Sequence, residues 1–596
     1  MCGIIGAFSW RANAAPPVRE HVERARDLMW RRGQDGSGYW ESDDRRAVFG
    51  HRRLAIIDLD DRSRQPLSRG PLTLVFNGEI YNYRILRMML ERSGARLETE
   101  GDSEVILALF ERDGPAAFAQ LRGMFAIALF DARDSTLTLA RDPYGIKPLY
   151  VGKANGQCWF ASQVKALRTV PVISSEPDPA GLTGFHLWGS VPEPFTLYRS
   201  IRALPGGHWQ CIDAHGAHEP VAYASIPSLL ANTAPGDPAE TEHIITTAVR
   251  DSVAAHLVAD VEVGLFLSAG IDSAALLGTM ATLGQSRIKA ITIGFTEYAG
   301  TELDEVPLAA RSAALYGAEH IVERLDRSDI EASLEAILET MDQPSIDGVN
   351  SWFASRAAHR AGLRVAMSGL GADELLAGYS TFDTVPALHR RVRRAAQLPF
   401  AAAIAEWGLR HGLRGFDSNH PKAAGVLRHG GTLPGAYLVS RALLIPSKLD
   451  AKLDREIIRE GLARLQPVER VATTMTPCPA SGTAQMMALE AGNYLRNQLL
   501  RDADWSSMAH TLELRTPFVD WPTLEAIAPV ASLLGQRRGK RALAGAPVPP
   551  LPDEIVKRRK SGFATPLNIR IRDNGTLDGS GSRDWADRVA RAFAAA

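Results

Sequence analysis

The chain has 596 residues, of which 45% are hydrophobic and 23% charged, and its formal net charge is −1. This is an ordinary globular composition with room for about two to four domains, and the near-neutral charge gives no general reason to expect nucleic acid or an anionic membrane as a partner. No apolar run approaches the ~20 residues that cross a bilayer, and the N-terminus lacks the basic and apolar regions of a signal peptide, so the sequence predicts a cytoplasmic protein. The four cysteines form no CxxC pair, which disfavours a disulfide framework or a structural zinc site.

The chain begins Met1-Cys2-Gly3. If Met1 is removed, Cys2 carries both a thiol and a free α-amino group, whose usual pKa near 8 lets it act as the base for its own side chain. A cysteine at position 2 is, on its own, more often incidental. The stretches that follow decide between the two interpretations.

The first half of the chain contains many short apolar runs separated by Gly, Asp and Asn, a pattern typical of a sheet-rich domain. Helices are expected between them at 82–92 and 103–112. Residues 213–240 are rich in Ala, Pro, Ser and Thr, which indicates a linker. We therefore expect one domain over 1–212, this linker, and a second domain over 241–596.

Seven stretches in the first half resemble, in order, the glutaminase domain of the N-terminal-nucleophile amidotransferases. They are MCGIIGAF, RRGQDGSG (31–38), GHRRLAIIDL (50–59), FNGEIYNY (76–83), EGDSEVILALF (100–110), GMFAIALFD (123–131) and RDPYGIKPLY (141–150). The resemblance implies a four-layer αββα sandwich with Cys2 as nucleophile. It also implies a glutamine site made by Arg53, Asn77, Gly78, Glu79 and Asp102.

The chemistry of those residue types agrees with that site. Carboxylates of Glu79 and Asp102 can hold an α-ammonium group, and Arg53 can clamp an α-carboxylate. Asn77 and the Gly78 N–H are suitable donors to an oxyanion. Structural alternatives remain, because an Asn-Gly pair is often a hairpin turn and Asp102 could cap a helix.

One departure from the glutaminase pattern is Gln34, which stands where most relatives carry proline. It affects a loop conformation rather than a reactive group.

The second half alternates helix and strand from about residue 241. We expect helices at 241–256, 273–283, 305–316, 329–341 and 351–361, and strands at 261–267, 288–295 and 364–367. This alternation predicts a doubly wound parallel sheet, which binds ligands beyond the carboxyl ends of its strands. Ser268 and Ser368 both lie at such ends, so the two strand exits should face one site.

The stretch VEVGLFLSAGIDS (261–273) has the form of a buried strand, a tight turn and a helix start. The unpaired N–H groups of a helix N-terminus attract phosphate, and small residues let it approach the backbone. A strand–Gly–helix junction is also a common structural device. The turn alone therefore leaves both interpretations open.

A second resemblance covers this half. LSAGIDS looks like the pyrophosphate loop of the ATP pyrophosphatases, SGLGADELLAGY (368–379) looks like its companion motif in asparagine synthetase-type enzymes, and residues 497–520 and 557–567 extend the match. The whole chain thus resembles the glutamine-hydrolysing asparagine synthetases of the B type, either as a typical member or as a divergent amidotransferase. The resemblance implies ATP and Mg²⁺, with Asp272 and Asp373 holding the metal. It further implies pyrophosphate contacts from Ser268, Gly270 and Ser273, an adenosine pocket lined by Leu267, Ile293, Ser368 and Gly369, and Lys560 as the cation that neutralises the adenylation transition state.

Three residues depart from the pattern of the synthetases. Ala269 replaces a commoner glycine and should be tolerated if its φ is negative. Leu370 stands where typical asparagine synthetases carry glutamate and β-lactam-forming relatives carry tyrosine, and leucine cannot transfer a proton. Trp505 stands where many place arginine.

The sequence therefore predicts a ligase that hydrolyses glutamine at Cys2, adenylates a carboxylate with ATP, and passes ammonia to it through an internal channel. The channel is implied by the family alone. Aspartate is the default acceptor, and a biosynthetic intermediate, peptide or sugar acid is the alternative. We also consider a non-catalytic regulatory relative and an amidotransferase with a sugar-phosphate isomerase half. The first is disfavoured by retention of Cys2, Asp272, Asp373 and Lys560, the second by the LSAGIDS loop. No nucleic acid or membrane partner is expected, and a homodimer is an open option.

Overall fold

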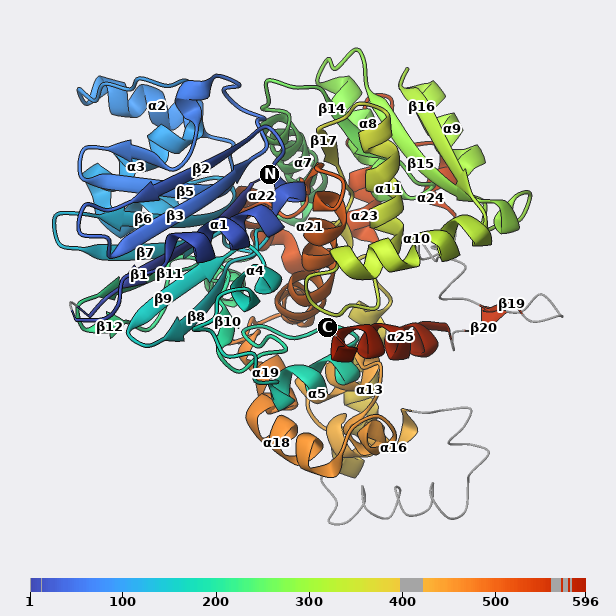
Figure 1. Ribbon diagram of the computed structural model, residues 1–596. Coiled ribbons are helices and arrows are strands. Elements are labelled where there is room, and N and C mark those ends of the chain that lie inside the picture. Colours follow the sequence, from blue (N-terminus) through green and yellow to red (C-terminus); the bar gives the residue numbers. More distant parts are fainter. Residues whose placement is uncertain are drawn as a thin grey trace.

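The computed structural model describes residues 2–11, 13–396, 422–558, 570–571, 577–578 and 581–595. Two antiparallel sheets form the first half of the chain, and a parallel sheet with its helices lies beside them (Figure 1). The two halves meet along a broad face, so segments far apart in sequence lie in contact.

The first sheet has six strands in the order β10-β8-β9-β1-β3-β2. Its strands are β1 (Gly3–Ser9), β2 (Gly36–Glu41), β3 (Ala47–Arg53), β8 (Tyr150–Ala154), β9 (Gln157–Ala161) and β10 (Ile201–Ala203). The central strand β1 is buried along its whole length, and it pairs antiparallel with β3 and β9. The residue before β1 is Cys2, so the sheet fixes the position of the candidate nucleophile.

The second sheet has seven strands in the order β12-β11-β7-β6-β5-β4, with β13 paired to β11. Its strands are β4 (Leu67–Arg69), β5 (Leu72–Ile80), β6 (Gly123–Asp131), β7 (Thr136–Arg141), β11 (His208–Asp213), β12 (Gly216–Ala217) and β13 (Val221–Ala222). Strand β5 is buried at every residue. It carries Asn77, Gly78 and Glu79 in its interior.

Phe8, Phe49, Phe130 and Phe160 fill the space between the two sheets. Helices α1 (Arg19–Leu28) and α4 (Val164–Arg168) pack on the first sheet, while α2 (Tyr83–Arg92) and α3 (Asp102–Asp113) flank the second (Figure 1). The αββα sandwich predicted from the resemblance is confirmed. Helices α2 and α3 correspond to the expected helices at 82–92 and 103–112.

The parallel sheet has the order β16-β15-β14-β17-β18, and every neighbouring pair in it is parallel. Its strands are β14 (Val263–Phe266), β15 (Lys289–Phe295), β16 (Glu319–Leu325), β17 (Val365–Met367) and β18 (Glu513–Arg515). The helices between them are α7 (Thr241–His256), α8 (Ile271–Thr282), α9 (Val306–Leu315), α10 (Arg327–Thr340) and α11 (Val349–Arg360). The predicted parallel sheet is confirmed, and each expected element is present.

Sequence reasoning missed strand β16. Its residues EHIVERL carry three charged groups, and only Leu325 is fully buried. The strand lies at the sheet edge, where one face and one flank need no apolar cover.

The predicted linker at 213–240 is partly structured. It contains β12, β13 and helix α6 (Ile226–Asn232), whose Ile226 and Leu230 are buried. The expectation of a plain connection therefore missed a helix that packs against the core.

Helix α5 (Pro179–Trp188) belongs to the first half of the chain and packs against helix α18 (Arg455–Leu465) of the second. The other elements of the second half follow β17 and are mostly helical. They are α12 (Ala372–Leu375), α13 (Thr381–Ala396), α16 (Ala423–His429), α17 (Leu433–Arg441), α19 (Pro467–Thr473), α20 (Gly482–Glu490), the π-helical segment η7 (Ala491–Leu500), α21 (Arg501–Met508), α22 (Trp521–Ile527), α23 (Arg538–Gly545), α24 (Asp553–Val556), α25 (Gly581–Ala595) and the short strands β19 (Arg570–Ile571) and β20 (Leu577–Asp578). Across the described ranges, no helix combines the length and apolarity needed to cross a membrane.

Candidate active sites

Cys2 lies buried at the start of β1, with 7% of its surface exposed. Its backbone N–H donates to Asn77 Oδ1 at 3.0 Å, and its thiol faces the Leu54 carbonyl at 4.0 Å. Burial raises the pKa of the thiol, and the carboxylates of Glu79 and Glu513 raise it further. A nearby base is therefore needed to make it nucleophilic at neutral pH.

Asn77 and Gly78 lie inside strand β5, so the hairpin-turn alternative is wrong. The Asn77 Nδ2 is buried without a hydrogen-bond partner, which leaves an amide donor beside Cys2. Gly78 has φ +152, and a Cβ there would lie 2.0 Å from the Met124 carbonyl oxygen. Glycine is therefore required next to the nucleophile.

Glu79 and Asp102 are both buried, and the structure brings them together. Burial, with the Glu513 and Asp102 carboxylates, holds the pKa of Glu79 well above its usual range. Burial also raises the pKa of Asp102 to about 7. Asp102 Oδ2 accepts from the Ile80 N–H at 3.0 Å, while the N-cap of α3 is Gly101. Asp102 thus binds strand β5 rather than acting as the N-cap of its own helix.

Arg53 is placed beside Cys2 by strand register, because Gly3 of β1 pairs with Arg52 of β3. Its guanidinium donates to the backbone carbonyls of Asp60, at 2.9 Å, and Asp58. The side chain is therefore held in place by the loop after β3. All the predicted glutamine-site residues surround the N-terminus of β1.

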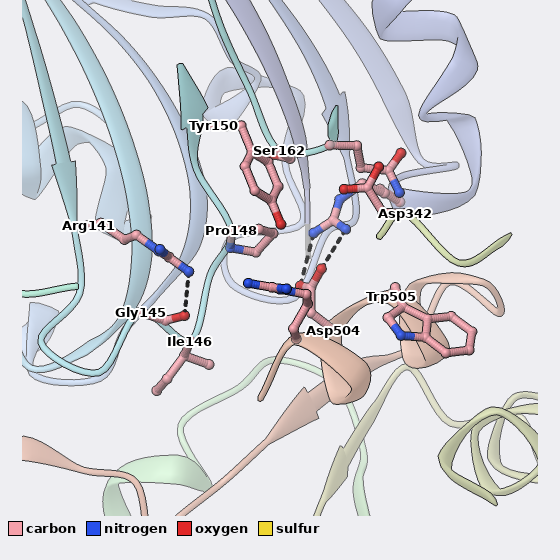
Figure 2. Close-up of a pocket in the computed structure, with 12 residues that line it drawn as sticks. Arg141, Gly145, Ile146, Pro148, Tyr150, Ser162, Asp342, Asp504 and Trp505 are labelled. Atoms are coloured by element: carbon pink, nitrogen blue, oxygen red, sulfur yellow. Dashed lines mark hydrogen bonds and ion pairs between the residues drawn. The ribbon is translucent and has the colours of Figure 1, made fainter. Parts of the chain in front are cut away.

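Arg32 links this site to the second half of the chain, and the sequence did not indicate it. Its Nε donates to the Cys2 carbonyl at 3.1 Å, and its two terminal nitrogens bind Asp504 at 2.7 and 3.0 Å. Both side chains are buried. A small interior pocket between the halves is lined by residues of both, and Figure 2 shows Asp504 near its centre, with Arg141, Ile146 and Tyr150 on one side and Trp505 on the other.

The loop between β14 and α8 holds a network of small side chains. Ser273 Oγ accepts from the Ser268 N–H at 3.0 Å, and Ser268 Oγ accepts from the Gly270 N–H at 3.2 Å. Gly270 is the N-cap of α8, and the φ angle of Ala269 is not positive. The condition for tolerating alanine in this loop is therefore met.

Lys540 on α23 connects the two predicted metal ligands. Its Nζ contacts Asp272 and lies 2.8 Å from Asp373 Oδ1. Burial lowers the pKa of Lys540, but the two carboxylates outweigh it and raise that pKa. Asp272 follows β14 and Asp373 follows β17, so the expected meeting of the two strand exits does occur.

Two glycines make room for this cluster. A Cβ on Gly378 would lie 2.1 Å from Asp373 Oδ1 and 2.3 Å from Lys540 Cε, and one on Gly369 would lie 2.9 Å from Asp272 Cβ. Gly369, expected near adenosine, thus stands directly against Asp272. These contacts tie the motif at 368–379 to the loop after β14.

The predicted nucleotide residues line one cavity of about 1330 Å³. Its walls include Leu267, Ser268, Gly270, Asp272, Ser273, Ile293, Ser368, Gly369 and Asp373. Leu370 lines the same cavity, whereas Trp505 lines the pocket between the halves. Lys560 lies outside the described residues.

Asp272 and Asp373 suit a hard divalent cation. Both carboxylates already surround one positive group, the Lys540 ammonium, and carboxylate oxygens with phosphate oxygens are the ligands that Mg²⁺ prefers. Among the described residues, no group of three or more acidic, His or Cys side chains is placed to hold a metal. A bound nucleotide would therefore have to complete the ligand set.

The chain matches two family models in sequence order. Residues 1–223 match a glutamine amidotransferase domain, and residues 245–588 match asparagine synthase. This defines a glutamine amidotransferase joined to a synthase that uses ATP.

Full-length relatives agree with this. The chain is 34% identical, over 97% of its length and 89% of the relative, to a protein of Mycobacterium tuberculosis provisionally named a glutamine-hydrolysing asparagine synthetase. It is 30% identical to asparagine synthetase 1 of Bacillus subtilis, with 95% and 87% covered, and 27% identical to the amidase chry2 of Gibberella zeae, with 95% and 89% covered. The chain belongs to the glutamine-hydrolysing asparagine synthetase family.

Proposed function

We propose that the protein forms a carboxamide from glutamine, ATP and a carboxylic acid, with two active sites in one chain. The observation that carries the proposal is the cluster of Asp272, Asp373 and Lys540 at the ends of β14 and β17. This cluster adjoins the loop at 268–273, which resembles a pyrophosphate-binding loop. In the other half of the chain, the buried Cys2 lies beside the Asn77 side-chain amide, whose Nδ2 has no hydrogen-bond partner. The two family matches support this pairing.

In the first site, the α-amino group of Cys2 takes the thiol proton after removal of Met1. The sulfur then attacks the glutamine amide carbon, while Asn77 Nδ2 and the Gly78 N–H hold the oxyanion. Ammonia leaves and a thioester forms, which water hydrolyses to glutamate. Glu79 and Asp102 hold the substrate ammonium, and Arg53 its carboxylate.

In the second site, an oxygen of the acceptor carboxylate attacks the α-phosphorus of ATP, and pyrophosphate leaves. Ammonia then attacks the acyl carbon and displaces AMP. The loop at 268–273 and Lys540 bind the phosphates and offset their growing charge, and Lys560 is proposed to assist. Mg²⁺ held by Asp272 and Asp373 would supply further charge neutralisation.

Ammonia must pass between the sites without being protonated, because ammonium is not a nucleophile. The pocket lined by Trp505 and Ile146 lies between the two halves, and we propose that ammonia passes through it. We propose domains at 1–212 and 241–596, joined by residues 213–240.

The test compares nitrogen donors. Cys2→Ala should abolish glutamine-dependent pyrophosphate release and leave ammonia-dependent release intact. Asp272→Asn should remove release with both donors while glutamine hydrolysis continues. Glutamine use by Cys2→Ala, or unchanged release by Asp272→Asn, contradicts the respective assignment.

The acceptor is a carboxylic acid. Aspartate is the acceptor that the family resemblance implies. Leu370, which lines the cavity and cannot transfer a proton, favours a different carboxylic acid.

A further inference from the structure

The nucleotide cavity extends to a wall that the phosphate cluster does not use. At about 1330 Å³ it exceeds the 300–1,000 Å³ typical of a site for one small molecule, so a second substrate fits beside ATP. This acceptor wall comes from α5, the turn before α11 with the start of that helix, the segment between β17 and α12, the end of α17 with the residues that follow it, and η7. It comprises Trp188, Ile346, Asp347, Asn350, Leu370, Arg441, Leu443, Tyr494 and Leu499.

Trp188 reaches this wall from the glutaminase half. The Ile346 N–H donates to the Gly189 carbonyl at 2.9 Å, and Ser190 pairs with Ser345 in an isolated β-bridge. The segment after α5 therefore holds the turn before α11 in place. The acceptor wall is made jointly by both halves of the chain.

Arg441, the cation of the acceptor wall, is already neutralised. It lies 2.7 Å from Glu490, whose side chain is fully buried. Its guanidinium also stacks on the rings of Tyr379, at 4.7 Å, and Tyr494, at 4.1 Å. A second carboxylate at this wall would compete with Glu490 for the same guanidinium.

The other described cations of the cavity lie on other elements than the acceptor wall. Lys540 pairs with Asp272 and Asp373, Lys557 with Asp553, and Arg558 with Glu305. Arg537 is the N-cap of α23, and Arg541 directly follows Lys540 on the same helix. None of these five belongs to the elements that build the acceptor wall.

The acceptor wall also contains an acidic residue, Asp347. Asp347 accepts the Gly348 N–H at 2.9 Å and lines the cavity. Behind it lies a second carboxylate, Asp502, which accepts from Ser345 Oγ at 2.6 Å and from the Trp505 indole at 2.8 Å. Burial and the neighbouring Asp347 charge raise the pKa of Asp502 to about 7, so a cation bound at Asp347 would relieve the repulsion between the two carboxylates.

Trp505 fixes this acidic turn. A Cβ on Gly348 would lie 2.7 Å from Trp505 Cζ2 and 3.1 Å from Asp502 Cβ. The indole thus occupies the space under the turn, where many relatives carry arginine. Around the acid, Leu370, Ile346 and Leu443 offer apolar contact.

We infer, resting on the proposed function, that the acceptor is a monocarboxylic acid that carries a protonated amine and an apolar body, rather than aspartate. Asp347 receives the amine, and Leu370, Ile346 and Trp188 contact the apolar body. The reacting carboxylate points to the loop at 268–273. A dicarboxylate would place its second charge against Asp347 or the paired Arg441.

The test uses the full-length protein with ATP, Mg²⁺ and ammonium chloride. Pyrophosphate release is measured with leucine, phenylalanine, 3-amino-3-phenylpropanoate, 3-phenylpropanoate, N-acetylphenylalanine, aspartate and glutamate. Binding of each acid is measured in parallel by calorimetry with a non-hydrolysable ATP analogue. At least one amine-bearing apolar acid should exceed aspartate tenfold in kcat/KM, and N-acetylation should reduce turnover tenfold.

Preference for aspartate, or no binding by any amine-bearing apolar acid, overturns the inference and leaves the proposed function intact. Binding of such an acid with no pyrophosphate release overturns the proposed function instead. The two failures are therefore distinguishable.

A variant pair locates the amine site. Asp347→Asn should raise KM at least tenfold for the preferred amine-bearing acid and leave KM for 3-phenylpropanoate unchanged. Asp553→Asn, at an exposed carboxylate of the same cavity, should leave both unchanged. Equal KM changes for both acids in Asp347→Asn overturn the assignment of Asp347, and retained binding of the ATP analogue verifies its fold.

Discussion

The glutamine site and the nucleotide site each contain a pair of carboxylates, but only the second pair shares a lysine between its members. Glu79 and Asp102 are buried with raised pKa values. The Arg515 guanidinium lies 3.9 Å from Glu79 but is bound to Glu513 at 2.7 Å. Asp272 and Asp373 meet Lys540 directly. The carboxylate pair of the glutamine site thus shares no cation among the described residues, and an incoming ammonium would stabilise the ionised carboxylates that burial disfavours. The nucleotide site is balanced before its substrate arrives and gains phosphate charge on binding.

Loss of Lys540 should separate the activities of the two sites more than any other change. In Lys540→Met, the two aspartates lose their shared cation and the phosphates lose a donor, so ammonia-dependent pyrophosphate release should fall at least about 100-fold. Glutamine hydrolysis should persist, because Lys540 lies in the other half. Lys557→Met, at an exposed lysine paired with Asp553, is the matched control and should change release less than about twofold. A small effect at Lys540 would show that the cluster is structural.

Gly378 tests whether the balance depends on close packing. In Gly378→Ala, the new Cβ would clash with Asp373 Oδ1 and Lys540 Cε, so release should fall about 10- to 100-fold because such misplacement disturbs alignment. In Gly545→Ala, on the helix α23 that carries Lys540, the new Cβ meets nothing within 4 Å, so this variant should behave like the unaltered protein. Steady-state kinetics with ammonia measures both, and equal activities would refute the packing argument.

Arg32 tests the connection between the two sites. Arg32→Lys keeps the charge but cannot bind Asp504 with two nitrogens and reach the Cys2 carbonyl as well. We expect about a tenfold rise in glutamate formed per pyrophosphate released, with ammonia-dependent release nearly unchanged, because the join beside the proposed ammonia path is loosened. Arg31→Lys, whose guanidinium lies 3.3 Å from Glu339 at the surface, is the neighbouring control. An unchanged ratio in Arg32→Lys would remove this role.

The glutamine site should show the smallest but most specific effect, a pH dependence of binding. Because burial raises the pKa of Asp102 to about 7, this carboxyl group is mostly ionised above pH 7 and mostly protonated below it. The substrate ammonium binds the ionised form, so affinity should be high above pH 7 and fall by up to about tenfold per pH unit below it. Calorimetry of glutamine with Cys2→Ala, which cannot turn over, measures this without the thiol titration. Constant affinity between pH 5.5 and 8 would contradict a raised Asp102 pKa.

Much of the site could be predicted because its residues adjoin chain features with local signals. Cys2 precedes a buried strand, Asn77 to Glu79 lie within another, and Ser268 and Asp272 lie at a strand–helix junction. Short-range apolar patterns define such elements. The placement of Cys2 and of the turn at 268–273 could therefore be stated before any coordinates, whereas Asn77 and Gly78 kept a hairpin turn as their alternative and were assigned to the site by the resemblance alone.

Lys540 and Arg32 could not be predicted this way. RGKRALAG reads as a basic helix surface, yet Lys540 is buried, with 7% of its surface exposed. Arg32 is followed by an interval of 472 residues before its partner Asp504. Ion pairs over such separations leave no periodic trace in the sequence.

By itself, the sequence determined the two-part architecture, the candidate nucleophile, and the loop and companion motif of the nucleotide site. Local hydrophobic periodicity and turn chemistry carry the architecture along the chain, and the resemblance of its motifs to those of the family implies the nucleophile and the nucleotide site. Only the tertiary structure decided that Lys540 joins Asp272 to Asp373, that Arg32 joins Cys2 to Asp504, and that Asp347 and Leu370 line one wall. The reason is physical: the balance of buried charge depends on which groups from distant segments come within a few ångströms of each other.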